Sequence, residues 1–353
     1  MMVWTGNGSL KEGKESMMET IIGVNKAILH ILDFNSNLTV YSASELELGK
    51  SSVAEFLMKH IEKAYCDPGA KPASFNPDSR FQEQLAAYRG GELSFVDFSV
   101  QVATWMVEAI ASSDKLISSD LLVCDLTVNG EPVLALLKCN NRIGFTHQVT
   151  QTEAGICNEI INHYAILPNP SQKIDEYAFV GSGSAGIRLA DKKCRIDGRE
   201  VFVLSDVVLN CQAQVSPKET IGRVTDIARK VAENHGENPA IAVSKAKTFI
   251  LENTEVSEVL DPMELGQEVF AASPIMRQEY LQEVEQAGIA GTVKIDRNLA
   301  VKTGRTQKIK TDTGIELSIP IDYFQNKEYV EFINQPDGTL SIALKNIGKL
   351  LSK

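Results

Sequence analysis

Two apolar runs joined by an Asn-Gly turn constrain the fold of this chain more than any other feature of its sequence. The runs are LLVCDLTV (residues 121–128) and PVLALLKC (residues 132–139), and Asn129-Gly130 lies between them. Asn and Gly readily adopt the positive φ angles of a tight hairpin turn, so this pattern predicts two long antiparallel strands. An antiparallel sheet is therefore expected in the N-terminal part of the chain.

Further periodic segments surround this hairpin. IIGVNKAILHILDF (residues 21–34) is expected to pair as a strand with LTVYSA (residues 38–43), because a turn-like Asn-Ser-Asn separates them. Apolar residues at helical spacing predict three helices, around residues 53–61, 81–88 and 95–110. More strands are expected at FTHQVTQ (145–151), YAFV (177–180) and EVFVLSDVVL (200–209). Together these elements predict an α+β domain with helices packed on an antiparallel sheet.

The pattern changes at Ser216. Ser216-Pro217-Lys218-Glu219 is a capping box with proline at the first helical position, and helical periodicity continues to Gln286. The chain then returns to strands at GIELSIPI (314–321), YVEFIN (329–334) and TLSIAL (339–344), which are expected to pack on a sheet. A chain of 353 residues exceeds the usual size of one core. We therefore expect a flexible leader (1–20), an α+β domain (21–213) and a helical domain ending in a β-hairpin (214–353).

Composition argues against several classes of protein. No apolar run is long enough to span a bilayer, and residues 1–20 lack the apolar core of a signal peptide, which predicts a cytoplasmic protein. The six cysteines and five histidines are dispersed, so reduced buried thiols are expected, with no metal and no cofactor. GxSxG, Walker, HExxH and EF-hand motifs are absent, and the sequence predicts no reaction.

Three segments resemble the bacterial nucleoid-associated protein family usually called NdpA. They are VNKAILHILDF near the start, SSDLLVCDLTVNGEPVLALLKCNN in the middle and GIELSIPIDYFQNKEYVEFINQPDGTLSIALKNI near the end. Their order and spacing match, and the resemblance runs from about residue 20 to the end of the chain. It implies a protein found with chromosomal DNA and without a known reaction, and it carries over no specific functional residue.

The charge distribution supplies candidate binding residues. The net charge is −11, yet the segment from residue 294 to residue 310, called here the basic segment, carries six cations and one anion. Gly and Thr residues among the cations suggest a flexible loop or ribbon. The functional interpretation of the basic segment is that its cations bind phosphate groups without sequence specificity. The alternative interpretation is a solvent-exposed loop whose cations only balance the negative charge of neighbouring acidic residues. The six candidate residues are Lys294, Arg297, Lys302, Arg305, Lys308 and Lys310.

An acidic run precedes the basic segment. Residues 251–286, called here the acidic face, contain nine carboxylates and the single cation Arg277. This run could repel DNA, dock a basic protein partner or pair with the basic segment, although most acidic helix faces are merely solvated.

One motif favours an enzyme. Residues 181–186, GSGSAG, fit G-x-G-x-x-G after a predicted strand, but the dinucleotide-binding turn requires a helix next, and only eight residues separate the motif from another predicted turn. A glycine-serine loop is the better interpretation, and a nucleotide-dependent enzyme is a distant alternative.

The leading hypothesis is a non-enzymatic nucleoid protein that binds duplex DNA without sequence specificity, as a homodimer formed through apolar strand edges. The main alternative is an acidic adaptor that a DNA-bound partner recruits to the nucleoid.

Overall fold

The computed structural model describes residues 2–4, 20–153, 155–182, 186–335, 339–349 and 351. The chain divides into two compact units, Met1–Gln214 and Val215–Lys353, here called the N-terminal and C-terminal units. The expected leader lies outside the described residues, apart from Thr20 and the short strand β1 (Met2–Trp4). No helix in the described part of the chain is long and apolar enough to cross a membrane.

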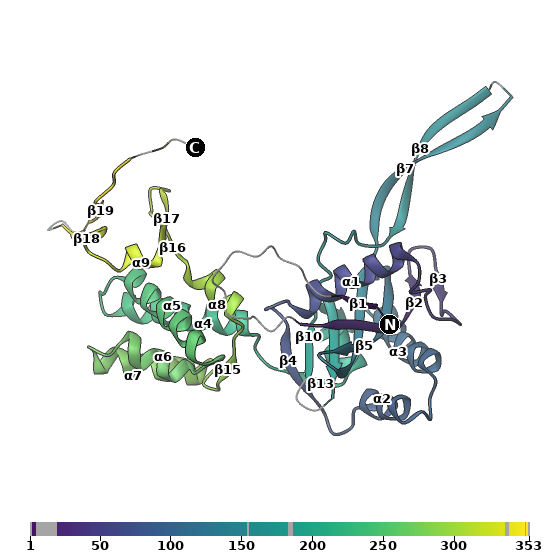
Figure 1. The fold of residues 1–353 in the computed structure, drawn as a ribbon, viewed down its shortest axis with the longest axis horizontal. Helices are drawn as coiled ribbons and strands as arrows, with labels where there is room; N and C mark the ends of the chain where they lie inside the picture. Colours follow the sequence, from purple (N-terminus) through teal and green to yellow (C-terminus); the bar gives the residue numbers. More distant parts are fainter. Residues whose placement is uncertain are drawn as a thin grey trace. The chain divides into compact units, whose positions relative to one another are not determined.

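An antiparallel sheet forms the centre of the N-terminal unit (Figure 1). Its strands follow the order β1-β2-β5-β6-β9-β10-β4-β13, and β3 pairs with the far end of β2. The predicted hairpin is confirmed, because Asn129 and Gly130 take φ angles of 50° and 88° between β5 and β6. The strands are β2 (Ile22–Asp33), β3 (Leu38–Val40), β4 (Lys71–Phe75), β5 (Ser119–Val128), β6 (Glu131–Asn140), β9 (Glu176–Gly181), β10 (Ile187–Ala190) and β13 (Cys211–Ala213).

Helices cover both faces of this sheet. Along β5, Leu121 and Val123 face one core with α2 (Arg80–Gly90) and α3 (Phe95–Ala111), because alternate side chains point to opposite faces. Leu122 and Cys124 face the other core, which α1 (Ser51–Tyr65) completes. The three predicted helices and the predicted α+β class with an antiparallel sheet are confirmed.

A buried ion pair joins two neighbouring strands of the sheet. Lys138 of β6 lies opposite Glu176 of β9, and its Nζ is 2.7 Å from Glu176 Oε2. Both residues are at most 5% exposed, and Asn140 hydrogen-bonds to both side chains. The pair is therefore satisfied within the protein and shielded from water.

Two strands leave the sheet as a separate ribbon, here called the arm. β7 (Arg142–Thr152) and β8 (Gly155–Ile166) pair only with each other in the described structure, and they extend away from the rest of the N-terminal unit (Figure 1). The sequence predicts a strand at residues 145–151 but not this separation from the sheet. Its exposed large apolar side chains are Ile143, Phe145, Val149, Ile156, Ile160, Tyr164 and Ile166.

The strand predicted over residues 200–209 is only partly correct. β11 (Lys193–Ile196) pairs with β12 (Arg199–Phe202), but residues Val203–Val208 form one turn of π-helix, η2. The Asp206 carboxylate accepts a hydrogen bond from the backbone N–H of Phe202 at the start of this turn. Leu209 N then donates to Leu204 O, and the apolar side chains of the turn enter the core that contains α3.

Four helices of the C-terminal unit begin in the same way. In each, a polar side chain caps a helix whose first residue is proline, an arrangement that fixes the first turn. Gly266 lets a neighbouring helix approach closely, because a Cβ at this position would lie 2.1 Å from the ring of the fully buried Tyr280. The helices are α4 (Pro217–Asn234), α5 (Pro239–Val256), α6 (Pro262–Val269) and α7 (Pro274–Gln286).

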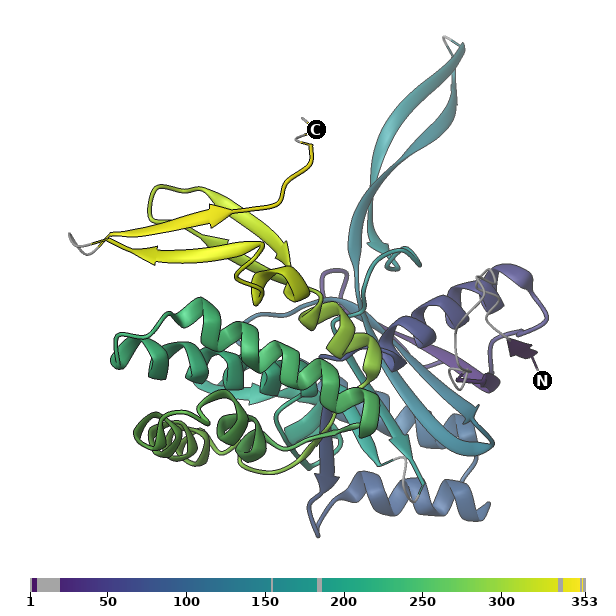
Figure 2. The same cartoon turned by 60° about the vertical axis from the view of Figure 1, so that its left-hand side comes forward.

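Two hairpins lie on the α5 side of these helices (Figure 2). The closing strands, which were expected to pack on a sheet, belong to two separate two-stranded hairpins within the described residues. Apolar side chains of both hairpins pack together with Ala240 of α5 and Phe324. The remaining elements are β14 (Val259–Leu260), β15 (Val293–Lys294), α8 (Arg297–Gly304), β16 (Thr306–Lys310), β17 (Glu316–Pro320), α9 (Ile321–Phe324), β18 (Val330–Asn334) and β19 (Leu340–Leu344).

Candidate nucleic-acid interface

The basic segment, expected as a flexible loop or ribbon, is a strand-helix-strand unit, and its last strand, β16, forms a two-stranded ribbon with β17. Asp296 Oδ1 caps α8 by accepting hydrogen bonds from Asn298 N at 2.8 Å and Leu299 N at 3.4 Å. Leu299 is buried in the helical core and anchors α8. At the other end, a Cβ on Gly304 would lie 3.3 Å from the backbone oxygen of Lys247, so glycine permits α8 to pack closely on α5.

The structure separates the six candidate cations into two groups. Lys294 and Lys310 form exposed ion pairs, at 2.9 Å with Glu258 and 3.0 Å with Glu316. The other four are exposed and have no ion-pair partner within the described residues. Arg297 begins α8, Lys302 lies in its last turn, Arg305 is its C-cap, and Lys308 lies in β16.

Lys302 and Arg305 lie three residues apart, so they share the solvent-facing side of α8. Arg305 is also fixed through its backbone, which donates to Val301 O at 3.1 Å and accepts from Ile321 N at 3.0 Å. Arg305 therefore projects from a backbone that hydrogen bonds to α8 and α9 hold in place.

Lys247 of α5 is a seventh cation at this position, and no pattern in the sequence places it there. Its Nζ donates to Thr306 O at 3.2 Å, where β16 begins. Partial burial, and then the nearby ammonium of Lys308, lowers the pKa of Lys247. An anion bound between the two ammonium groups would relieve their repulsion. Lys247 lies far from the basic segment in sequence, and only the packing of α8 on α5 brings the two together.

Comparison with known families identifies the chain. A family model described as nucleoid-associated protein YejK, NA37, matches residues 28–351.

The chain belongs to this family.

The nucleoid-associated family expected from the sequence is thus confirmed, and a nucleoid-associated role is supported. A comparison with curated proteins gives no match.

The acidic face of this NA37-family chain is partly neutralised from within the C-terminal unit. Glu283 pairs with Lys230 of α4 at 2.7 Å, and Glu279 bonds to His235 at 2.6 Å. Within the described structure, Lys294–Glu258 is the one ion pair between the acidic face and the basic segment. The remaining exposed carboxylates without an ion pair among the described residues are Glu252, Glu255, Glu264, Glu268 and Glu285.

The glycine motif at residues 181–186 lacks the helix that a dinucleotide turn requires. Gly181 ends β9, and β10 follows as an antiparallel strand from Ile187. Gly181 N donates to Gly186 O at 2.8 Å, which closes a connection between two strands. Residues 183–185 lie outside the described part, and the order of elements around them excludes the helix N-terminus that would bind a pyrophosphate.

Among the described residues, no three His, Cys, Asp or Glu side chains gather as a metal site. Burial raises the pKa of the Cys124 and Cys139 thiols, so both remain protonated at neutral pH. Cys66 and Cys157 are exposed, which departs from the expectation of buried thiols.

Proposed function

We propose that this protein associates with the nucleoid of the bacterial cytoplasm by binding duplex DNA without sequence specificity. The basic segment supplies the contact, and no chemical reaction is involved. The observation that carries the proposal is the group of four exposed cations on α8 and β16 that form no ion pair with any described residue, with Lys247 beside them.

Counterion release supplies the binding free energy. Each phosphate that a Lys or Arg side chain neutralises releases condensed cations from the duplex, which favours binding despite the net charge of −11. The basic segment contains no aromatic residue, so stacking on single strands is disfavoured relative to backbone contact with duplex. A homodimer would present two such segments, and binding through one would raise the effective concentration of the other.

We expect neutralising the four cations without ion pairs to abolish most of the salt dependence of DNA binding. The variant carries Arg297→Gln, Lys302→Gln, Arg305→Gln and Lys308→Gln. Fluorescence anisotropy with a labelled duplex of about thirty base pairs, across a salt series, gives the slope of log affinity against log salt. Four lost phosphate contacts should reduce that slope by about 3.6, at about 0.9 per contact.

A matched control changes the net charge equally in the N-terminal unit. It carries Lys50→Gln, Lys59→Gln, Lys192→Gln and Lys193→Gln, four exposed lysines that form surface ion pairs. The control should keep the slope of the unmodified protein. An equal loss in both variants would mean that overall charge, rather than the basic segment, governs binding.

The acidic face supports a second candidate function, an adaptor that a DNA-bound protein recruits. Five exposed carboxylates without an ion pair among the described residues suit a basic protein partner. The same salt series discriminates the two functions. An unmodified protein that fails to bind duplex even at low salt contradicts direct contact and leaves the adaptor.

A further inference from the structure

The arm exposes apolar side chains that no described residue of the N-terminal unit covers. Phe145, Val149, Ile156 and Ile160 are 75%, 61%, 71% and 81% exposed. A two-stranded ribbon with water on both faces is marginally stable by itself. An exposed apolar surface of this kind marks a binding surface.

These four side chains lie on one face of the ribbon. The cross-strand pairs are Phe145 with Asn162, His147 with Ile160, Val149 with Asn158, and Gln151 with Ile156. Residues directly opposite in a ladder share a face, so each pair contributes one apolar and one polar side chain. The apolar member alternates between β7 and β8, which produces a zigzag of apolar side chains along the arm.

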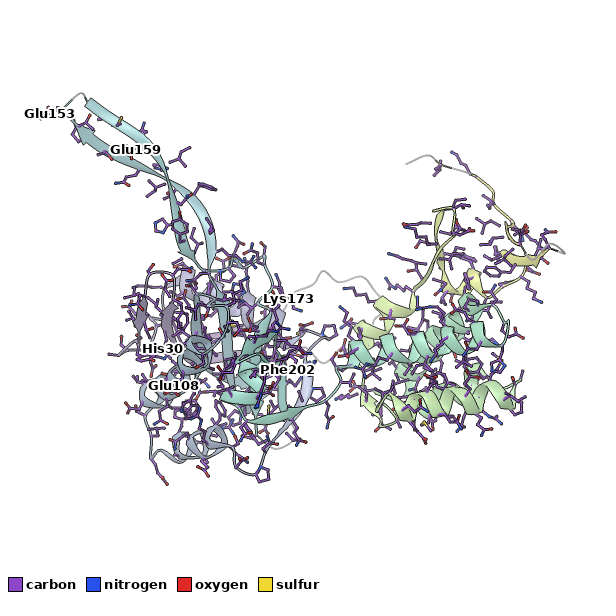
Figure 3. All side chains as sticks on the ribbon, turned by 180° about the vertical axis from the view of Figure 1, so that it is seen from behind. His30, Glu108, Glu153, Glu159, Lys173 and Phe202 are labelled. Atoms are coloured by element: carbon purple, nitrogen blue, oxygen red, sulfur yellow. The ribbon has the colours of Figure 1, made fainter. Side chains whose placement is uncertain are left out.

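The charges of the arm exclude a nucleic acid as its ligand. Its ionic residues are Arg142, Glu153 and Glu159, which leaves a net charge of −1. Figure 3 shows Glu153 at the tip and Glu159 farther down the ribbon. A phosphate backbone would meet carboxylates there rather than cations, which is the reverse of what DNA binding needs.

We propose that the apolar face of the arm binds the same face of the arm of a second copy of this chain. The proposal rests on the homodimer of the proposed function and names its surface. Two copies, each with a net charge of −11, repel one another over most of their surfaces. The apolar face of the arm carries no Asp, Glu, Lys or Arg, so two arms meet there without apposing like charges.

The pattern on the arm is self-complementary. About a two-fold axis the same patch faces itself, so the apolar side chains of the two arms cover one another. Eight large apolar side chains and their neighbours would bury on the order of 1,000 Å² in total, which reaches the area of a stable interface.

Two lysines on the apolar face test this proposal. Val149→Lys and Ile160→Lys together bring four ammonium groups into the interface, and the dimer dissociation constant should rise at least about 100-fold. The control, Thr146→Lys with Gln148→Lys, adds the same charge to the opposite face and should change that constant by less than about threefold. Sedimentation equilibrium of the full chain measures both.

Hydrogen exchange of the unmodified protein supplies a readout that needs no variant. Exchange of the arm amides should slow as the concentration rises through the range in which the dimer forms. A dimer that persists in Val149→Lys/Ile160→Lys, or arm exchange that is independent of concentration, overturns the arm interface while leaving the homodimer intact. A protein that stays monomeric overturns both.

Discussion

Glu176→Ala is expected to lower the free energy of unfolding of the N-terminal unit by about 3–5 kcal/mol. The change removes the carboxylate opposite Lys138 and leaves the ammonium group buried in the sheet, with Asn140 Oδ1 as its remaining partner at 2.8 Å. An uncompensated buried charge is costly because no water reaches it. Urea unfolding followed by circular dichroism measures the loss.

Replacing both Lys138 and Glu176 distinguishes two contributions to the loss of stability, an unpaired buried charge and a packing defect. Lys138→Met with Glu176→Leu keeps the approximate volume and removes both charges, so the double variant should unfold near the unmodified protein or at higher urea. A double variant as unstable as Glu176→Ala would show that packing, rather than the unpaired ammonium of Lys138, accounts for the loss.

Gly266→Ala is expected to destabilise the C-terminal unit by about 3 kcal/mol. The added methyl group would lie 2.1 Å from Tyr280 Cδ1, and the Tyr280 ring is fully buried between the helices. The ring cannot move aside without opening the packing of α6 and α7, so the overlap is relieved only by shifting backbone. Thermal unfolding followed by circular dichroism reports the change.

Gly222→Ala is the matched control for this prediction. Gly222 also lies within a helix, α4, but a Cβ there meets no atom within 4 Å. Alanine should therefore stabilise the protein by about 0.5–1 kcal/mol, through its higher helix propensity alone. If Gly266→Ala also stabilised the unit, the close contact with Tyr280 would not limit the packing of these helices.

The elements predicted correctly are those whose signal is local. Asn129-Gly130 specifies a turn that does not depend on the rest of the molecule, and the apolar runs beside it are buried on both faces of the sheet. Ser216-Pro217 likewise marks the start of α4. Both signals act within a few residues, and the sequence displays them directly.

The arm, and the position of Lys247 beside the basic segment, depend on contacts between residues far apart in the sequence. Residues 145–151 have a strand pattern, but nothing in it indicates that β7 leaves the sheet and pairs only with β8 among the described residues. Lys247 joins the cations of β16 because Gly304 lets α8 approach α5. The sequence contains Gly304, but it does not indicate that α5 packs closely against this residue.

The position of β4 has a consequence for the order in which the molecule forms during synthesis. β4 lies between β10 and β13, which follow it far along the chain, with registers Ile187 to Ala73 and Cys211 to Phe75. The nascent strand emerges from the ribosome long before either neighbour; one edge stays unpaired until β10 has been made, and the other until residue 213 has been made. Closing these long loops is slow compared with forming helices whose capping residues and prolines act locally. The C-terminal helices are therefore made last but fold fastest. The N-terminal unit completes its sheet only after its own last strand, β13, has been synthesised.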